Sequence, residues 1–196
     1  MKSKLLKVGI PVFLIGGFTW VMMGFPPNPR VGYAPEQPIK YSHKLHAGQY
    51  NIDCQYCHTT VTMGKKAAVP SLNICFNCHE VVGDKGTFNT GDKNTDKLYE
   101  GEVEKLRAYW DKNQVPNWIR IHNLPDHVRF SHQPHIHAFL KPGQPTKEVC
   151  KLCHGDIASM EVVRQDKPVN TMGFCISCHR DNKALGAQVN CSTCHY

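Results

Sequence analysis

Cysteine and histidine recur together in this chain with a fixed order and spacing. All 10 cysteines of the 196 residues lie in five pentapeptides that read Cys-x-x-Cys-His. This pattern is typical of covalent haem c attachment, in which two cysteines form thioethers with the porphyrin and the histidine binds the iron from one side. The predicted attachment residues are Cys54, Cys57, Cys75, Cys78, Cys150, Cys153, Cys175, Cys178, Cys191 and Cys194, and the predicted proximal ligands are His58, His79, His154, His179 and His195. The sequence therefore predicts five haem c groups.

Other kinds of cysteine chemistry explain the pattern less well. Paired Cys-x-x-Cys motifs can hold zinc, and an even number of cysteines in an exported protein can form a disulfide framework. Neither chemistry requires a histidine directly after every second cysteine, as all five copies have. Zinc binding and disulfides compete with haem attachment here, and a Soret band together with a haem stain that survives denaturation would exclude both.

A second pattern, an aromatic residue followed by Ser-His-x-x-His, occurs twice. Tyr41–His46 precedes the first haem motif and Phe130–His135 precedes the third. Residues three apart lie on one face of a helix, so the two histidines of each copy can reach neighbouring irons. The duplication indicates an internal repeat and favours iron ligation over ordinary surface histidines. The predicted distal ligands are therefore His43, His46, His132 and His135.

The N-terminal segment has the pattern of a membrane anchor. A short basic stretch is followed by Val8–Phe25, which is apolar apart from Thr19. Such a helix rises about 27 Å, close to the hydrocarbon thickness of a bilayer. The alternative, a cleaved signal peptide, has a shorter apolar region and a small-residue cleavage site. We expect an uncleaved single-pass anchor in the cytoplasmic (inner) membrane, with the rest of the chain on the periplasmic side.

Size limits how the chain can be organised. Roughly 40 residues per haem are too few for a separate core around each one, so the haems themselves must form much of the interior. We expect a mostly irregular and α-helical fold, and no nucleic-acid partner, because haem propionates nearly cancel the formal charge of +7. The expected segments are the anchor (1–25), a proline-rich spacer (26–40), a module with two haems (41–83), a connector with a loop and a helix over 96–112 (84–116), and a module with three haems (117–196).

Longer segments resemble one family. The stretches "GYAPEQPIKYSHKLHAGQYNIDCQYCH", "VPSLNICFNCH", "WIRIHNLPDHVRFSHQPHIHA" and "MEVVRQDKPVNTMGFCISCHR" are similar to the pentahaem, membrane-anchored cytochrome c subunit of bacterial alternative complex III. The resemblance implies a class III-like multihaem fold in two copies. It implies as partners polytopic quinol-binding subunits, an iron–sulfur subunit, a monohaem cytochrome c and, at the end of the chain of transfer, a terminal oxidase.

The same resemblance extends the set of candidate ligands. His122 stands at a position that matches the family pattern, which makes it a further distal candidate. Because the family admits a mixed His/Met haem and methionine raises the iron potential, Met160 and Met172 are candidates as well. His127 and His137 remain without a predicted role. By analogy with small multihaem cytochromes, we expect His43 to face His58 and His132 to face His154.

These features favour electron conduction through closely packed haems, from a quinol-side donor to a periplasmic cytochrome c or an oxidase. No nucleophile–base arrangement or phosphate-binding loop is present in the sequence, so we expect no catalytic site in this chain. The main competing function is that of an anchored quinol dehydrogenase that oxidises quinol directly, although the spacer argues against contact with the bilayer. Two further candidates are a nitrite or hydroxylamine reductase, which needs an open axial position, and a haem-storage protein.

Overall fold

The computed structural model describes residues 30–83 and 90–196. The predicted anchor, the first part of the spacer and residues 84–89 of the connector lie outside these ranges. Within them, no helix combines the length and the apolar character that crossing a bilayer requires.

Short helices joined by irregular segments make up the described part of the chain, which contains no β-strand and confirms the expected mostly α and irregular fold. The one bridge of β type in these residues joins Val128 to His195. The helices are η1 (Lys44–Gln49), α2 (Cys54–Cys57), α3 (Leu72–His79), α4 (Lys93–Tyr99), α5 (Glu102–Asp111), α6 (His132–Phe139), α7 (Thr146–His154), η2 (Ile157–Ser159), α8 (Met172–Asp181), η3 (Lys183–Leu185) and α9 (Cys191–Cys194).

Each Cys-x-x-Cys-His motif lies on a helix that ends at or beside the motif, because one helical turn places both cysteines on the same face. Polar side chains start two of these helices. Asp53 accepts a hydrogen bond from the backbone N–H of Gln55 at 2.8 Å, and Thr171 accepts one from Phe174 at 3.4 Å. Such caps satisfy N–H groups that the first turn leaves unpaired. Helix geometry therefore presents each motif for attachment.

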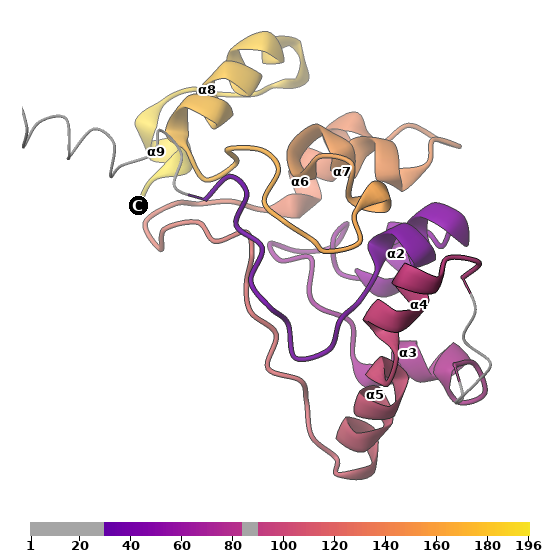
Figure 1. The fold of residues 1–196 in the computed structure, drawn as a ribbon. Helices are drawn as coiled ribbons and strands as arrows, with labels where there is room; N and C mark the ends of the chain where they lie inside the picture. The colour runs from indigo at the N-terminus through magenta and orange to yellow at the C-terminus, as the bar shows by residue number, and fades with distance from the viewer. Residues whose placement is uncertain (1–29, 84–89) are drawn as a thin grey trace, which may run out of the picture.

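The motif helices follow one another through the molecule in an order that differs from the sequence. Figure 1 shows α3 and α5 at the lower right, then α2, then α6 and α7, with α8 and α9 at the upper left. Phe76 of α3 packs on Trp110 of α5 with ring centroids 4.4 Å apart. Gln55 of α2 donates to the hydroxyl oxygen of Thr146 at the start of α7, at 3.0 Å. The first and third motifs are thus neighbours although they are far apart in the chain.

The connector differs from its prediction in one respect. The sequence favours a single helix over 96–112, whereas the structure has α4 and α5, separated at Gly101. Gly101 has a φ of +77° and precedes the first residue of α5. Glycine adopts this left-handed conformation without the steric cost that other residues meet. Gly101 therefore permits the turn that separates α4 from α5.

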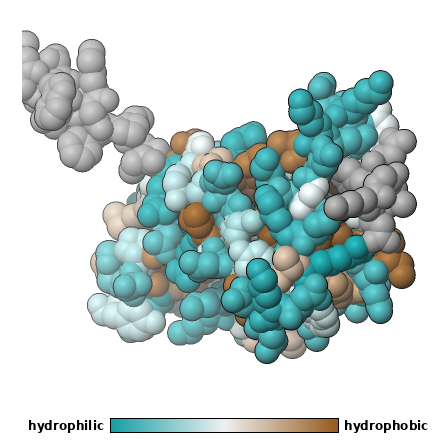
Figure 2. Space-filling view, turned by 60° about the horizontal axis from the view of Figure 1, so that its bottom comes forward, coloured by the Kyte–Doolittle hydropathy of each residue, from teal (hydrophilic) through white to brown (hydrophobic). Residues whose placement is uncertain are grey.

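Few side chains are buried together in the described residues. The central cluster consists of Val61, Ile136 and Val149, with a few apolar neighbours packed on it. Large apolar side chains within the motifs, such as Tyr56 and Leu152, are 44% and 47% exposed. Figure 2 shows apolar patches scattered among the polar surface. So small a core fits an interior that porphyrins complete, as the size of the chain predicts.

Candidate haem-binding site

The two copies of the aromatic-Ser-His-x-x-His pattern have nearly the same geometry. Tyr41 lies edge-on to His43 at 4.8 Å and stacks on His46 at 4.4 Å between ring centroids. Phe130 lies edge-on to His132 at 4.9 Å and packs on His135 at 4.7 Å. The aromatic ring therefore holds the two imidazoles of each copy in different directions. This is the physical role of the first residue in the pattern.

Three distal candidates face proximal histidines at nearly equal distances. The ring centroids of His46 and His79 are 6.0 Å apart, those of His135 and His179 are 6.0 Å apart, and those of His132 and His154 are 6.3 Å apart. A bond from an imidazole nitrogen to a metal ion is about 2.0 Å long, so two rings on opposite sides of one iron have centroids about 6 Å apart. The three pairs fit an iron between their rings.

The remaining distal candidate of the first module is His43. Burial lowers the pKa of His43 to about 4, and the neighbouring His58 and His46 contribute in the same direction. Its Nδ1 atom is buried and has no hydrogen-bond partner among the described residues. The pairing of His43 with His58, which the analogy with small multihaem cytochromes implies, stays a prediction.

Backbone carbonyls determine which ring nitrogen carries the proton in most of these imidazoles. Because a carbonyl oxygen can only accept a hydrogen bond, an Nδ1 atom bonded to it carries the proton, and Nε2 keeps its lone pair for a metal. The bonds from Nδ1 are His46 to Ser42 (2.8 Å), His58 to Ala68 (2.7 Å), His79 to Val82 (3.0 Å), His132 to Lys65 (2.8 Å), His135 to Ser131 (2.7 Å) and His179 to Gln188 (2.5 Å). The histidines on both sides of the predicted irons are therefore prepared to bind through Nε2.

The structure brings His122 to a proximal histidine in a different way. Its Nε2 atom is 3.4 Å from Nδ1 of His154, and the two rings are perpendicular with centroids 4.4 Å apart. Burial lowers the pKa of His154 to about 3, and His122 and His132 add to the effect. His122 thus lies on the Nδ1 side of His154, while His132 faces the same ring from 6.3 Å.

The two methionine candidates differ in how deeply they are buried. Met160 is 4% exposed, and its carbonyl accepts a hydrogen bond from the backbone N–H of Lys44 at 3.0 Å. Met172 begins α8 and is 66% exposed. These positions do not assign either methionine to an iron, so their ligand roles stay predictions.

One histidine without a predicted role lies opposite a proximal ligand. His127 and His195 have ring centroids 5.5 Å apart and planes inclined by 20°. His137, the other unassigned histidine, is exposed on α6. The sequence offered no signal for His127, because His43, His46, His122, His132 and His135 already supplied five distal candidates.

The donor set distinguishes haem from a bare metal ion. The described residues contain no group of three or more His, Cys, Asp or Glu side chains that could hold a metal ion. A pair of imidazoles is too small a set for zinc, which usually takes four protein ligands, whereas a porphyrin supplies the remaining nitrogens itself. The paired histidines beside Cys-x-x-Cys turns therefore fit haem.

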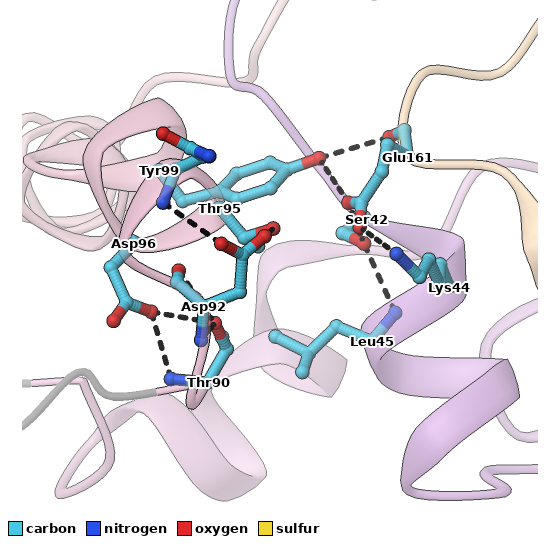
Figure 3. A network of polar contacts seen from close by, with 10 residues as sticks. Ser42, Lys44, Leu45, Thr90, Asp92, Thr95, Asp96, Tyr99 and Glu161 are labelled. Carbon is cyan, nitrogen blue, oxygen red and sulfur yellow. Dashed lines mark hydrogen bonds and ion pairs between the residues drawn. The ribbon is translucent and has the colours of Figure 1, made fainter.

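A polar network holds η1, the helix that contains His46, in place. Figure 3 shows Ser42, Lys44 and Tyr99 converging on the carboxylate of Glu161. Ser42 donates to it at 2.7 Å, Tyr99 at 3.0 Å and Lys44 at 3.0 Å. Ser42 also accepts from the backbone N–H of Leu45 at 3.0 Å, at the start of η1. Glu161 therefore links η1, which follows His43 and contains His46, to α4.

Neighbouring motifs also contact each other directly. Asn77 of the second motif donates to the hydroxyl of Tyr56 in the first at 2.9 Å. His132 and His135 lie on α6 but face the third and fourth motifs, respectively. Gln188 accepts from His179 of the fourth motif through its carbonyl and from Thr193 of the fifth through its side chain. With the bond from α2 to α7, the spatial order is second, first, third, fourth, fifth.

Comparison with known proteins agrees with this site. Residues 128–196, which contain the last three motifs, match the family described as cytochrome c7 and related cytochrome c. The last three motifs, together with His132 and His135, thus lie in a segment that is similar to known cytochromes c. The chain is also 26% identical, over an alignment of 208 positions, to a protein named "Menaquinone reductase, multiheme cytochrome c subunit" from Nitratidesulfovibrio vulgaris (strain Hildenborough). This similarity covers 95% of the chain and 90% of that protein.

Proposed function

We propose that this chain carries five haem c groups and transfers electrons as a subunit of a membrane quinone oxidoreductase complex. The observation that supports it most is the set of opposed histidine pairs about 6 Å apart, each beside a haem-attachment motif. Ligation from both sides would leave the iron of each of these three sites no open position for a substrate. A nitrite or hydroxylamine reductase, which needs such a position, would have to use the first or the fifth site.

The residues of the chain hold and orient the groups that conduct. Haem supplies a one-electron redox centre. The cysteines fix each porphyrin to a helix, the proximal and distal histidines bind from opposite sides, and backbone carbonyls keep the Nδ1 protons in place. The spatial order of the motifs makes the second and fifth sites the two ends of the path, with the third site at its centre.

The relative suggests what lies at one end of this path. Its name couples a multihaem cytochrome c subunit to menaquinone reduction. For this chain we propose the quinol-oxidising direction of an alternative complex III-like assembly, with quinol-binding membrane subunits, an iron–sulfur subunit and a monohaem cytochrome c as partners. Transfer in the opposite direction, towards menaquinone, is the second candidate, because the similarity to that subunit covers nearly the whole chain.

Two experiments test this proposal. In the purified complex, a quinol analogue should reduce the haems of this chain, whereas the isolated subunit should not oxidise the same quinol. Quinol oxidation by the isolated subunit would instead support an anchored quinol dehydrogenase. Reduction of menaquinone by the complex, without quinol oxidation, would support the second candidate.

The proposed location has its own test. We propose that residues 1–25 anchor the chain in the cytoplasmic membrane, with the haem domain in the periplasm. A chain in which a cleavable signal peptide replaces residues 1–25 should then carry haem and appear in the soluble periplasmic fraction. If the unaltered chain is already found in that fraction after a carbonate wash, the anchor is wrong.

A further inference from the structure

We propose that His127 is the distal iron ligand of the fifth haem site and that His122 is a positioning residue for the third. The proposal rests on the proposed haem binding and assigns two residues within it. It places the fifth distal ligand outside the set that the sequence predicts. It also gives His122 a role different from iron ligation.

Backbone pairing holds His127 at the fifth motif. Val128 forms an antiparallel bridge with His195, and the N–H of Arg129 donates to the carbonyl of Cys194 at 2.8 Å. The guanidinium of Arg129 also lies over the ring of Tyr196, 4.3 Å from its centroid. These contacts lie directly beside His127 in the chain. They bring its segment to the fifth motif independently of how the two imidazoles are oriented.

The geometry of the His127 pair resembles that of the other pairs. Its centroid distance of 5.5 Å lies close to the 6.0 Å of His46 and His79. Two imidazoles on opposite sides of one iron have centroids about 6 Å apart, so the His127 pair needs only a small outward movement of its rings to bind one. His127 comes from the segment before α6, and among the described histidines it is the one whose ring packs against that of His195.

His122 cannot serve the third iron in the same way. The ring of His154 already faces His132 at 6.3 Å, and His122 lies against its other nitrogen, Nδ1. When Nε2 of His154 binds iron, Nδ1 carries the proton and donates it to Nε2 of His122. The lone pair that His122 would need for an iron is then used in this hydrogen bond.

This hydrogen bond distinguishes the third site from its neighbours. His58, His79 and His179 donate from Nδ1 to backbone carbonyls, whereas Nδ1 of His154 faces a side chain. The hydrogen-bond partner of a metal-binding histidine sets the orientation and the basicity of its ring, and thereby tunes the redox potential of the metal. His122 therefore orients His154 and adjusts the potential of the haem at the centre of the path.

Single substitutions in the full-length protein separate the two roles. His127→Ala should convert one haem from low-spin to high-spin in the electron paramagnetic resonance spectrum, and added imidazole should restore it. His122→Ala should leave all haems low-spin and shift the midpoint potential of one. His137→Ala, at an exposed position on α6, is the matched control and should change neither.

Further outcomes keep the proposal falsifiable. If His127→Ala leaves every haem low-spin, or His122→Ala produces the high-spin haem, the assignment is overturned. Unchanged potentials in His122→Ala remove its positioning role. His127→Met covers the case in which the alanine variant does not mature, because it should keep five haems while raising one potential. Fewer than five covalent haems in the unaltered protein would overturn the proposed function itself, whatever these variants show.

Discussion

The imidazoles of His132 and His154 face each other with ring centroids 6.3 Å apart and planes inclined by only 10°. They come from different helices, α6 and α7, which pack together around Ile136 and Val149. In the spatial order of the motifs this pair lies at the centre. Under the proposed function, ligation by this pair would therefore affect electron transfer between the two halves of the chain.

Replacing the distal histidine of this central pair should change one potential. In His132→Met, a thioether replaces an imidazole, which raises the potential of one haem by on the order of 0.1 V, within the range over which axial ligands tune haem. Redox titration followed by visible absorption measures this shift. His137→Met, on the exposed side of the same helix, should leave all potentials unchanged. An unchanged potential in His132→Met, or a shift of similar size in both variants, would contradict a ligand role for His132.

Removing Glu161 should destabilise the packing of η1, the helix that contains His46, against α4. In Glu161→Ala the hydroxyl of Ser42, which is only 2% exposed, loses its acceptor, whereas Tyr99 keeps the backbone carbonyl of residue 161 as its remaining acceptor. A buried polar group left without its partner costs about 1–3 kcal/mol in the free energy of unfolding. Denaturant titration measures the loss. Glu36→Ala, at an exposed site, should cost far less, and equal losses would contradict the role of the network.

The same carboxylate predicts a dependence on pH. Burial alone would raise the pKa of Glu161, but hydrogen bonds from Ser42, Lys44 and Tyr99 outweigh it and hold the pKa below its ordinary value. A group whose pKa is lower in the folded state stabilises it above the unfolded-state pKa, and this contribution is lost as the pH falls through the folded-state value. Glu161→Gln should therefore destabilise the protein at pH 7 and should lose less stability than the unaltered chain on acidification below about pH 4.5. Parallel stability–pH curves would contradict this account.

Substitution of Gly101 by alanine should destabilise the protein more than substitution by asparagine. At a φ of +77°, alanine in Gly101→Ala costs about 1–2 kcal/mol, because its Cβ atom approaches the neighbouring backbone. Asparagine visits this conformation more readily, so Gly101→Asn should cost less. Thermal unfolding of the two variants compares them. If alanine is tolerated better than asparagine, the left-handed turn between α4 and α5 is not required.

Local chemistry was predictable from the sequence because it is encoded in adjacent residues. Five consecutive residues define each attachment motif, and the spacing of His43 and His46 defines a helical face. The single helix over 96–112 was expected because the apolar pattern continues across Gly101, although a glycine inside a helix weakens it. The partner of His195 was not predicted. Its position depends on the pairing of Val128 and Arg129 with a motif far along the chain.

The spatial order of the motifs depends on contacts of the same kind. Gln55 and Thr146 meet across most of the described chain, and no local pattern marks either residue as a contact. Sequence reasoning thus supplied candidate residues for haem attachment and iron binding. It could not predict which motifs would be neighbours, because that depends on tertiary packing.

The central claim is that five porphyrins are covalently attached to this chain and complete its interior. Intact mass spectrometry of the matured protein under denaturing conditions tests it most directly. The account predicts a mass that exceeds the polypeptide by five haem groups, with all ten cysteines used in attachment. A mass with fewer than five haems, or a colourless protein with the mass of the bare chain, would contradict it.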